Sequence, residues 1–174
     1  VNKGPNRVAP LTIPMSISNI ASGAIAIKFG LLGSSFSITS ACASSTHCIG
    51  EAYRNIKDGY SDIIFAGGSE ASICEFGISS FQSLTALSKS EDRNRSSIPF
   101  DLNRNGFVMG EGAGVLILED LESALKRGAK IYCEIVGYGT TSDAYHITSP
   151  CPDGNGAYRC MRDAMADASV NCTE

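Results

Sequence analysis

Hydrophobic and polar positions divide the chain into alternating helical and extended stretches. Residues 15–29 carry apolar side chains on nearly every face of a predicted helix, and Gly30 follows as a stop. A helix that is apolar all round is typical of a buried element, so we expect this one to be buried. Further helices are predicted after the small residues 40–45 up to residue 58, over residues 121–127 and, with one polar face, over residues 155–168.

Short runs of β-branched and other apolar residues predict strands over residues 35–39, 62–66, 115–119 and 131–137. The last two runs are apolar enough to be buried strands. Residues 74–87 are predicted as irregular helical turns, and residues 88–97 and 140–152 as loops. Because strands alternate with helices, the pattern indicates an α/β layered fold.

The composition indicates how much of the chain's surface is hidden from solvent and which partners it can bind. Hydrophobic residues make up 43% of the chain and charged residues 18%, and that charged share is below the ~25% of typical soluble domains. We therefore expect much of the surface to be hidden, either in a large core or against another chain. The net charge of −4 argues against nucleic acid as a partner, because phosphate binding needs a basic excess.

The chain has seven Cys, without a C-x-x-C pair, and only two His. Structural zinc needs four such ligands at short paired spacings, so no metal is expected. Neither a charged-then-apolar leader nor an apolar run of ~18 residues is found in the sequence. We infer free thiols, a cytoplasmic location and no contact with a membrane.

Cys42 lies between a predicted strand and the first turn of a predicted helix. The unpaired N–H groups and the macrodipole at a helix start favour an anion, and the thiolate is the nucleophilic form of cysteine. Its neighbours Ala41, Ala43 and Ser44 are small enough to leave room for a substrate. A structural cysteine is the alternative interpretation.

The two histidines do not form an obvious pair with this thiol. His47 lies about 140° around the predicted helix from Cys42, so a local Cys–His dyad is not expected. A core histidine with satisfied hydrogen bonds is the simpler interpretation. His146 belongs to the polar loop 142–150, which fits either the entrance of a site or a plain surface turn. The other six cysteines lack the setting of Cys42 and are interpreted as core or surface thiols, with Cys133 in a buried strand.

Several motifs follow one another along the whole chain. They are Ser40-Ala41-Cys42-Ala43-Ser44, residues 64–70 (IFAGGSE), Phe81 with residues 86–88 (ALS), residues 99–101 (PFD), 104–107 (RNGF), 110–114 (GEGAG), 127–132 (RGAKIY) and 142–150 (SDAYHITSP). In this order they resemble the β-ketoacyl-[acyl-carrier-protein] synthases, the ketosynthases of type II fatty-acid synthesis. In that family a small-residue run surrounds the nucleophilic cysteine, and Cys42 matches it.

The resemblance implies a thiolase-like αβαβα layered fold and a homodimer without a cofactor. It also implies an acyltransferase reaction. Cys42 takes an acyl group from acyl-carrier protein, and malonyl-carrier protein then loses CO₂ and condenses with that acyl group to give 3-oxoacyl-carrier protein. Phe81 matches a position in the acyl pocket, and the segment with Asp143, His146 and Thr148 matches a mobile element near the entrance, so these four are candidate substrate-binding residues.

The resemblance also implies that parts of the family fold lie outside this sequence. The N-terminal part and most of the second half have no counterpart, nor do the two catalytic histidines or the Gly-Phe-Gly-Gly loop. We expect residues 1–140 to belong to the first, nucleophile-bearing half and residues 141–174 to form the entrance loop and the first helix of a truncated second half. Alone, this segment is expected to be inactive in condensation.

Two alternatives to a condensing enzyme remain open. One is a non-catalytic ketosynthase-like partner subunit, although such partners usually lack the cysteine that is present here as Cys42. The other is a thiolase-fold relative that uses coenzyme A thioesters. The GEGAG and DAYH segments favour the carrier-protein branch.

Overall fold

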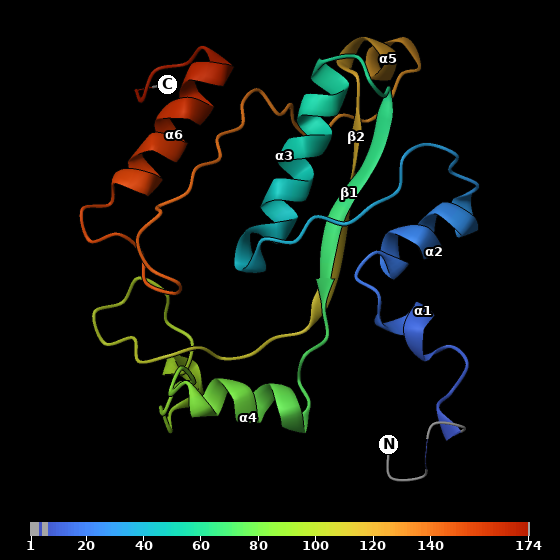
Figure 1. Ribbon diagram of the computed structural model, residues 1–174. Coiled ribbons are helices and arrows are strands. Elements are labelled where there is room, and N and C mark those ends of the chain that lie inside the picture. The colour runs from blue at the N-terminus through green and yellow to red at the C-terminus, as the bar shows by residue number, and fades with distance from the viewer. Residues whose placement is uncertain (1–3, 5–6, 174) are drawn as a thin grey trace. The chain divides into compact units, whose positions relative to one another are not determined.

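The computed structural model describes residue 4 and residues 7–173, in two compact units (Figure 1). One unit combines residues 1–51 with residues 137–174, and the other comprises residues 52–136. The first therefore contains the segment around Cys42 together with the C-terminal part of the chain. The second contains the sheet.

The first unit is helical. It contains α1 (Thr12–Ser16), α2 (Ile20–Phe29), the 3₁₀ turn η2 (Ala41–Ala43), the beginning of α3 (Ser44–Lys57) and α6 (Asn155–Ala168). The bounds of α6 are the predicted ones. The single helix predicted over residues 15–29 is wrong in one respect, because Ile17 is extended (ψ 140°) and separates α1 from α2. Gly30 closes α2 in the left-handed conformation (φ 65°), as predicted.

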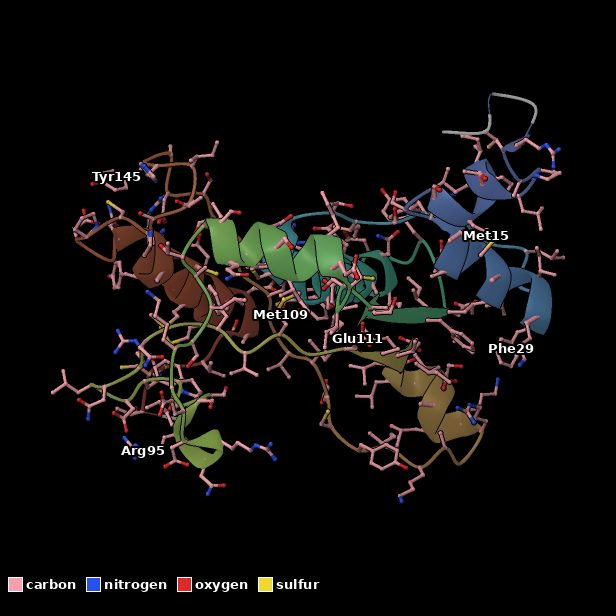
Figure 2. The ribbon with its side chains drawn as sticks, turned by 90° about the horizontal axis from the view of Figure 1, so that it is seen from below. Met15, Phe29, Arg95, Met109, Glu111 and Tyr145 are labelled. Atoms are coloured by element: carbon pink, nitrogen blue, oxygen red, sulfur yellow. The ribbon has the colours of Figure 1, made fainter. Side chains whose placement is uncertain are left out.

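The expected burial of the apolar helix is not found in the described chain. The side chains of Met15 on α1 and Phe29 at the end of α2 are 75% and 59% exposed (Figure 2), and no residue of α2 is buried. Among the described residues, the main packing of α2 against another helix or strand is its contact with α1. Exposed apolar surfaces of this kind are typical of sites that another protein covers. The low charged content therefore fits a surface hidden against another chain.

The second unit contains an antiparallel sheet. Strands β1 (Ile63–Glu70) and β2 (Gly112–Glu119) pair over their full length, from Ile63 opposite Glu119 to Glu70 opposite Gly112 (Figure 1). Both strands extend beyond the predicted runs because glycine tolerates the close approach of the two backbones. A Cβ on Gly67 would lie 2.1 Å from the carbonyl oxygen of Gly114, so the glycines permit pairing instead of ending it.

Three other elements complete this unit: α4 (Glu75–Ser83), the 3₁₀ turn η3 (Arg93–Arg95) and α5 (Leu121–Lys126). The irregular turns predicted over residues 74–87 are largely the regular helix α4. Its start is capped by Cys74, whose Sγ accepts a hydrogen bond from the N–H of Gly77 at 3.4 Å. A thiol is not among the usual capping groups, which explains why the sequence pattern did not reveal this helix start.

Two predicted strands, 35–39 and 131–137, are wrong, because both segments are extended without strand pairing in the described chain. A strand depends on hydrogen bonds to a neighbouring strand, and β-type residues alone do not supply that neighbour. The buried strand predicted at 115–119 forms, but Val115, Leu116 and Ile117 are 50–62% exposed. The large core is also not found, since the described apolar residues that are buried are Ala52, Ala66 and Ala124.

An ion pair joins the end of β2 to α5. The Glu119 carboxylate accepts hydrogen bonds from Arg127, with Nε–Oε1 2.8 Å and Nη2–Oε2 2.6 Å, and its side chain is 8% exposed. The guanidinium lowers the pKa of Glu119 below its usual 4.5, against the opposing effect of burial. The lowered pKa means that this pair stabilises the fold fully above about pH 4.5, and that the stabilisation is lost as the pH falls through the folded-state pKa.

We therefore expect Arg127→Gln to lower the melting temperature at neutral pH, and the difference from wild type to shrink below about pH 4.5. Thermal unfolding followed by circular dichroism between about pH 7 and pH 3 measures it. Lys126→Gln removes the same charge one residue earlier without removing the pair, and it should show no such pH dependence. A difference for Arg127→Gln that stays constant over this pH range would contradict the assignment.

Candidate active site

The segment around Cys42 is a strained turn that leads into a long helix. Extended residues end at Ser40 (φ −150°, ψ 47°), η2 follows, and α3 continues for 14 residues. Ala41 has φ +50°. This left-handed conformation costs a non-glycine residue roughly 1–2 kcal/mol and persists only where its surroundings hold it.

Ser44 braces this turn from within. Its Oγ accepts a hydrogen bond from the N–H of Ser40 at 2.8 Å and donates one to the carbonyl oxygen of Ala41 at 2.7 Å. The N–H of Ala43 donates to the carbonyl oxygen of Ser40 at 3.1 Å. These bonds fix the backbone on both sides of Cys42, so the position of its sulfur follows from the fold of the turn.

Cys42 itself is exposed in the described chain. It is the second residue of η2, which runs directly into α3. The first N–H groups of a helix lack intrahelical acceptors, and together with the macrodipole they favour a negative charge at this place. The turn therefore presents the thiol at a helix start, as the sequence predicted.

His47 forms hydrogen bonds with two hydroxyl groups. It is half-buried in the first turns of α3, with Nδ1 2.5 Å from the Oγ of Ser40 and Nε2 3.0 Å from the Oγ1 of Thr140. Both ring nitrogens are thus occupied by hydroxyls, which confirms the predicted satisfied hydrogen bonds. The predicted core position is wrong, because His47 is only half-buried. The chain Ser40–His47–Thr140 was not visible in the sequence, because Thr140 lies 93 residues from His47 and carries no local signal.

The other cysteines occupy different settings. Cys160 donates its thiol hydrogen to the carbonyl oxygen of Gly139 at 3.1 Å. A hydrogen bond to the Asp153 carboxylate raises the pKa of the Cys151 thiol, which disfavours its nucleophilic form. The prediction that Cys133 lies in a buried strand is wrong. This residue is exposed, and it belongs to no strand of the described chain.

The predicted substrate loop is organised by its own side chains. The Asp143 carboxylate accepts the N–H of Cys151 at 2.9 Å, and it lies against Gly156 at the start of α6, where a Cβ would collide with its Oδ1. His146 Nδ1 accepts the N–H groups of Thr148 and Ser149, each at 3.1 Å. Asp143, His146 and Thr148 are all exposed.

These contacts fix the loop while leaving side chains available for contact. With Nδ1 accepting, a neutral His146 carries its hydrogen on Nε2, which can donate to a ligand. Tyr145, labelled in Figure 2, follows the left-handed Ala144 (φ 49°) and is 58% exposed.

Phe81 lies on α4 in the second unit, whereas the remaining candidate residues belong to the first. Its ring meets Phe107 edge-on, with centroids 6.4 Å apart, and 37% of the residue is exposed. This arrangement is an aromatic pair of the kind that lines an apolar surface.

Within residue 4 and residues 7–173, no cluster of three His, Cys, Asp or Glu side chains is arranged to hold a metal ion. Over the same residues, no helix has the length and hydropathy needed to cross a bilayer.

Comparisons with known proteins match the whole chain. Residues 1–124 match the family model of the β-ketoacyl synthase N-terminal domain, and residues 132–174 match that of the C-terminal domain. The 3-oxoacyl-[acyl-carrier-protein] synthase 2 of Staphylococcus aureus is 48% identical over 170 residues, and that of Rhizobium meliloti (strain 1021) is 46% identical over 175 residues. They cover 98% and 99% of this chain, which spans 42% of the length of each.

Solved structures give the same picture. A type II PKS acyl-carrier protein in complex with its ketosynthase bound to the hexaketide matches with a TM-score of 0.93 at 37% identity, over 97% of this chain and 42% of that one. A β-ketoacyl synthase from Burkholderia phymatum STM815 matches with a TM-score of 0.89 at 34% identity, over 95% and 40%. The ishigamide ketosynthase/chain length factor matches with a TM-score of 0.88 at 36% identity, over 99% and 41%.

Proposed function

Because this chain belongs to the β-ketoacyl synthase family and has its thiolase-like fold, we propose that Cys42 is the nucleophile that accepts an acyl group from an acyl-carrier-protein thioester. The observation that carries the proposal is the braced turn that presents an exposed Cys42 thiol at the start of α3. Cys74 also lies at a helix start, but its Sγ caps α4 by accepting the N–H of Gly77. The reaction class is acyl transfer in fatty-acid biosynthesis.

The acyl transfer follows from the geometry of the turn. The Cys42 thiolate attacks the carbonyl carbon of the acyl thioester, and the resulting oxyanion accepts hydrogen bonds from backbone N–H groups, among them that of Cys42. The carbon–sulfur bond to the carrier's phosphopantetheine then breaks, and the departing thiolate takes up a proton. The acyl group remains on Cys42 as a new thioester.

We propose that condensation follows in the intact enzyme. Malonyl-carrier protein loses CO₂, and the electron pair of the broken bond forms a carbanion that attacks the acyl-Cys42 carbonyl. Cys42 leaves as a thiolate, and the product is 3-oxoacyl-carrier protein, two carbons longer. The two histidines that the family resemblance implies for this step have no counterpart in the sequence, so the 174 residues alone support acyl transfer without condensation.

Further proposals concern substrate contacts and partners. Phe81 lines the acyl pocket, and Asp143, His146 and Thr148 contribute to substrate binding near the entrance. The protein acts as a cytoplasmic homodimer and binds acyl-carrier protein. Support comes from the solved ketosynthase in complex with its acyl-carrier protein and from the exposed apolar surface of α1 and α2, which suits coverage by protein.

A non-catalytic partner subunit is the second candidate function. The similarity to a ketosynthase/chain length factor structure favours it. The presence of Cys42 on a turn suited to a nucleophile favours the catalytic role. The two candidates differ in one property, because a non-catalytic subunit carries no acyl group.

The choice of acyl donor tests the proposal. Incubation with acyl-carrier protein should add one acyl group per chain, detected as a mass increase of the intact protein, and the same acyl group on coenzyme A should transfer more slowly. Faster transfer from coenzyme A would favour the thiolase-fold alternative. No adduct from either donor would favour the non-catalytic subunit.

A further inference from the structure

The Ser40–His47–Thr140 chain connects the residue before the strained Ala41 to a distant segment. Nδ1 of His47 contacts the Oγ of Ser40, and Nε2 contacts the Oγ1 of Thr140. In either neutral tautomer one ring nitrogen donates and the other accepts, and each hydroxyl can take the complementary role. The imidazole therefore bridges two hydroxyls, and it holds Ser40 through the side-chain Oγ, whereas Ser44 binds the backbone N–H of Ser40.

The far end of this bridge is anchored by close backbone packing. Residues 137–140 are extended, so Gly137 and Gly139 face one way and Tyr138 and Thr140 the other. A Cβ on Gly139 would lie 2.1 Å from the carbonyl oxygen of Cys160 on α6, and one on Gly137 would lie 2.3 Å from that of Ala164. The two glycines thus let this segment lie directly against α6.

The other side of the segment packs on α3. The ring of Tyr138 fills the space above the buried Gly50, where a Cβ would lie 2.2 Å from the ring, and it meets His47 edge-on with centroids 6.4 Å apart. The N–H of Tyr138 donates to the Asp167 carboxylate at 3.0 Å. Thr140 is therefore a fixed point, held by α6 on one side and α3 on the other.

We propose that His47 is a positioning residue that fixes the Cys42 turn by tying Ser40 to Thr140. Ala41 stores backbone strain, and a strained turn keeps one conformation only while neighbouring bonds hold it. Loss of the bridge allows the turn to relax and displaces the Cys42 sulfur relative to the acyl donor. The inference rests on the proposed role of Cys42 as acyl acceptor. His47 does not take the proton of Cys42 in this scheme, because hydroxyls occupy both of its nitrogens.

The test compares a variant that keeps one half of the bridge with a variant that keeps neither half. An asparagine amide lies near the place of Nδ1 and keeps the bond to Ser40, whereas His47→Leu removes both bonds. We expect His47→Leu to slow acyl transfer to the protein by about 10- to 100-fold through the maximum rate, with little change in KM for acyl-carrier protein. His47→Asn should recover most of that loss.

A double-mutant cycle links the effect to Ser40. Ser40→Ala alone should slow acyl transfer, and adding it to His47→Leu should produce little further loss, because the two residues act through one contact. Thr140→Val, which keeps the side-chain shape, should give a smaller loss in the same direction. Far-UV circular dichroism and thermal melts of each variant separate this loss from unfolding.

The outcomes separate the two proposals. If the wild-type protein takes up no acyl group on Cys42, the proposed function fails. If wild type is acylated and folded His47→Leu is acylated at the same rate, or His47→Asn is as slow as His47→Leu, the positioning role of His47 is overturned. Full additivity of Ser40→Ala and His47→Leu would also overturn it.

Discussion

Replacement of Cys42 by alanine is expected to reduce acyl transfer to the protein by at least about 10⁴-fold, the scale on which acyl-transfer enzymes lose activity when their nucleophile is removed. The physical reason is that the braced turn at the start of α3 presents one exposed thiol as the nucleophile. Single-turnover assays with labelled acyl-carrier protein measure the loss.

Cys48→Ala is the matched control for this substitution. Cys48 lies on the same helix, α3, and is half-buried, so its loss should leave the acyl-transfer rate within about twofold of wild type. Cys42→Ser keeps the size of the side chain but replaces the thiol with a much weaker nucleophile, and it should be nearly as inactive as Cys42→Ala. Retention of acyl transfer by folded Cys42→Ala would assign the nucleophile to another residue.

The second large effect concerns stability. Gly139→Ala is expected to destabilise the fold by about 2–3 kcal/mol, because the added Cβ meets backbone atoms of α6, the carbonyl oxygen of Cys160 at 2.1 Å and the nitrogen of Ala164 at 2.8 Å. Backbone of a helix cannot move aside as a flexible side chain can. The segment should shift away from α6 and carry Thr140 with it, so acyl transfer should slow as well.

Gly110→Ala provides the control for Gly139→Ala. A Cβ at Gly110 meets no atom within 4 Å, so this variant should be as stable as wild type or more stable by up to about 1 kcal/mol through its effect on the unfolded chain. Denaturant unfolding of the two variants and wild type measures the difference. Equal midpoints for Gly139→Ala and Gly110→Ala would contradict the packing described for residues 137–140.

Local signals in the sequence predicted those elements whose ends are set by nearby residues. Helix α6 has its predicted bounds, and the left-handed Gly30 follows α2 as predicted. Strands depend on partners, and the extended segments 35–39 and 131–137 have the right residues without a pairing strand in the described chain. Helix α4 was missed because a thiol caps its start.

The candidate site also has one part that local sequence signals predict and one part that depends on distant residues. Cys42 was found from its neighbours alone, because small residues before a helix leave a local signature. The support for its turn was only partly visible. Ser44 lies close enough in sequence to suggest a brace, whereas the bridge through His47 needs Thr140, which folding alone brings near. Site residues that act through distant partners leave no spacing pattern to recognise.

The acyl group should be carried by the sulfur of Cys42. Trypsin cleaves after Lys28 and Arg54, so Cys42 and Cys48 fall in one peptide, and fragment-ion mass spectrometry must place the adduct within it. After incubation of the protein with acyl-carrier protein, the account predicts the added mass on fragments that contain Cys42 and its absence from those that contain only Cys48. An adduct on Cys48 or on another cysteine, with Cys42 unmodified, would contradict it.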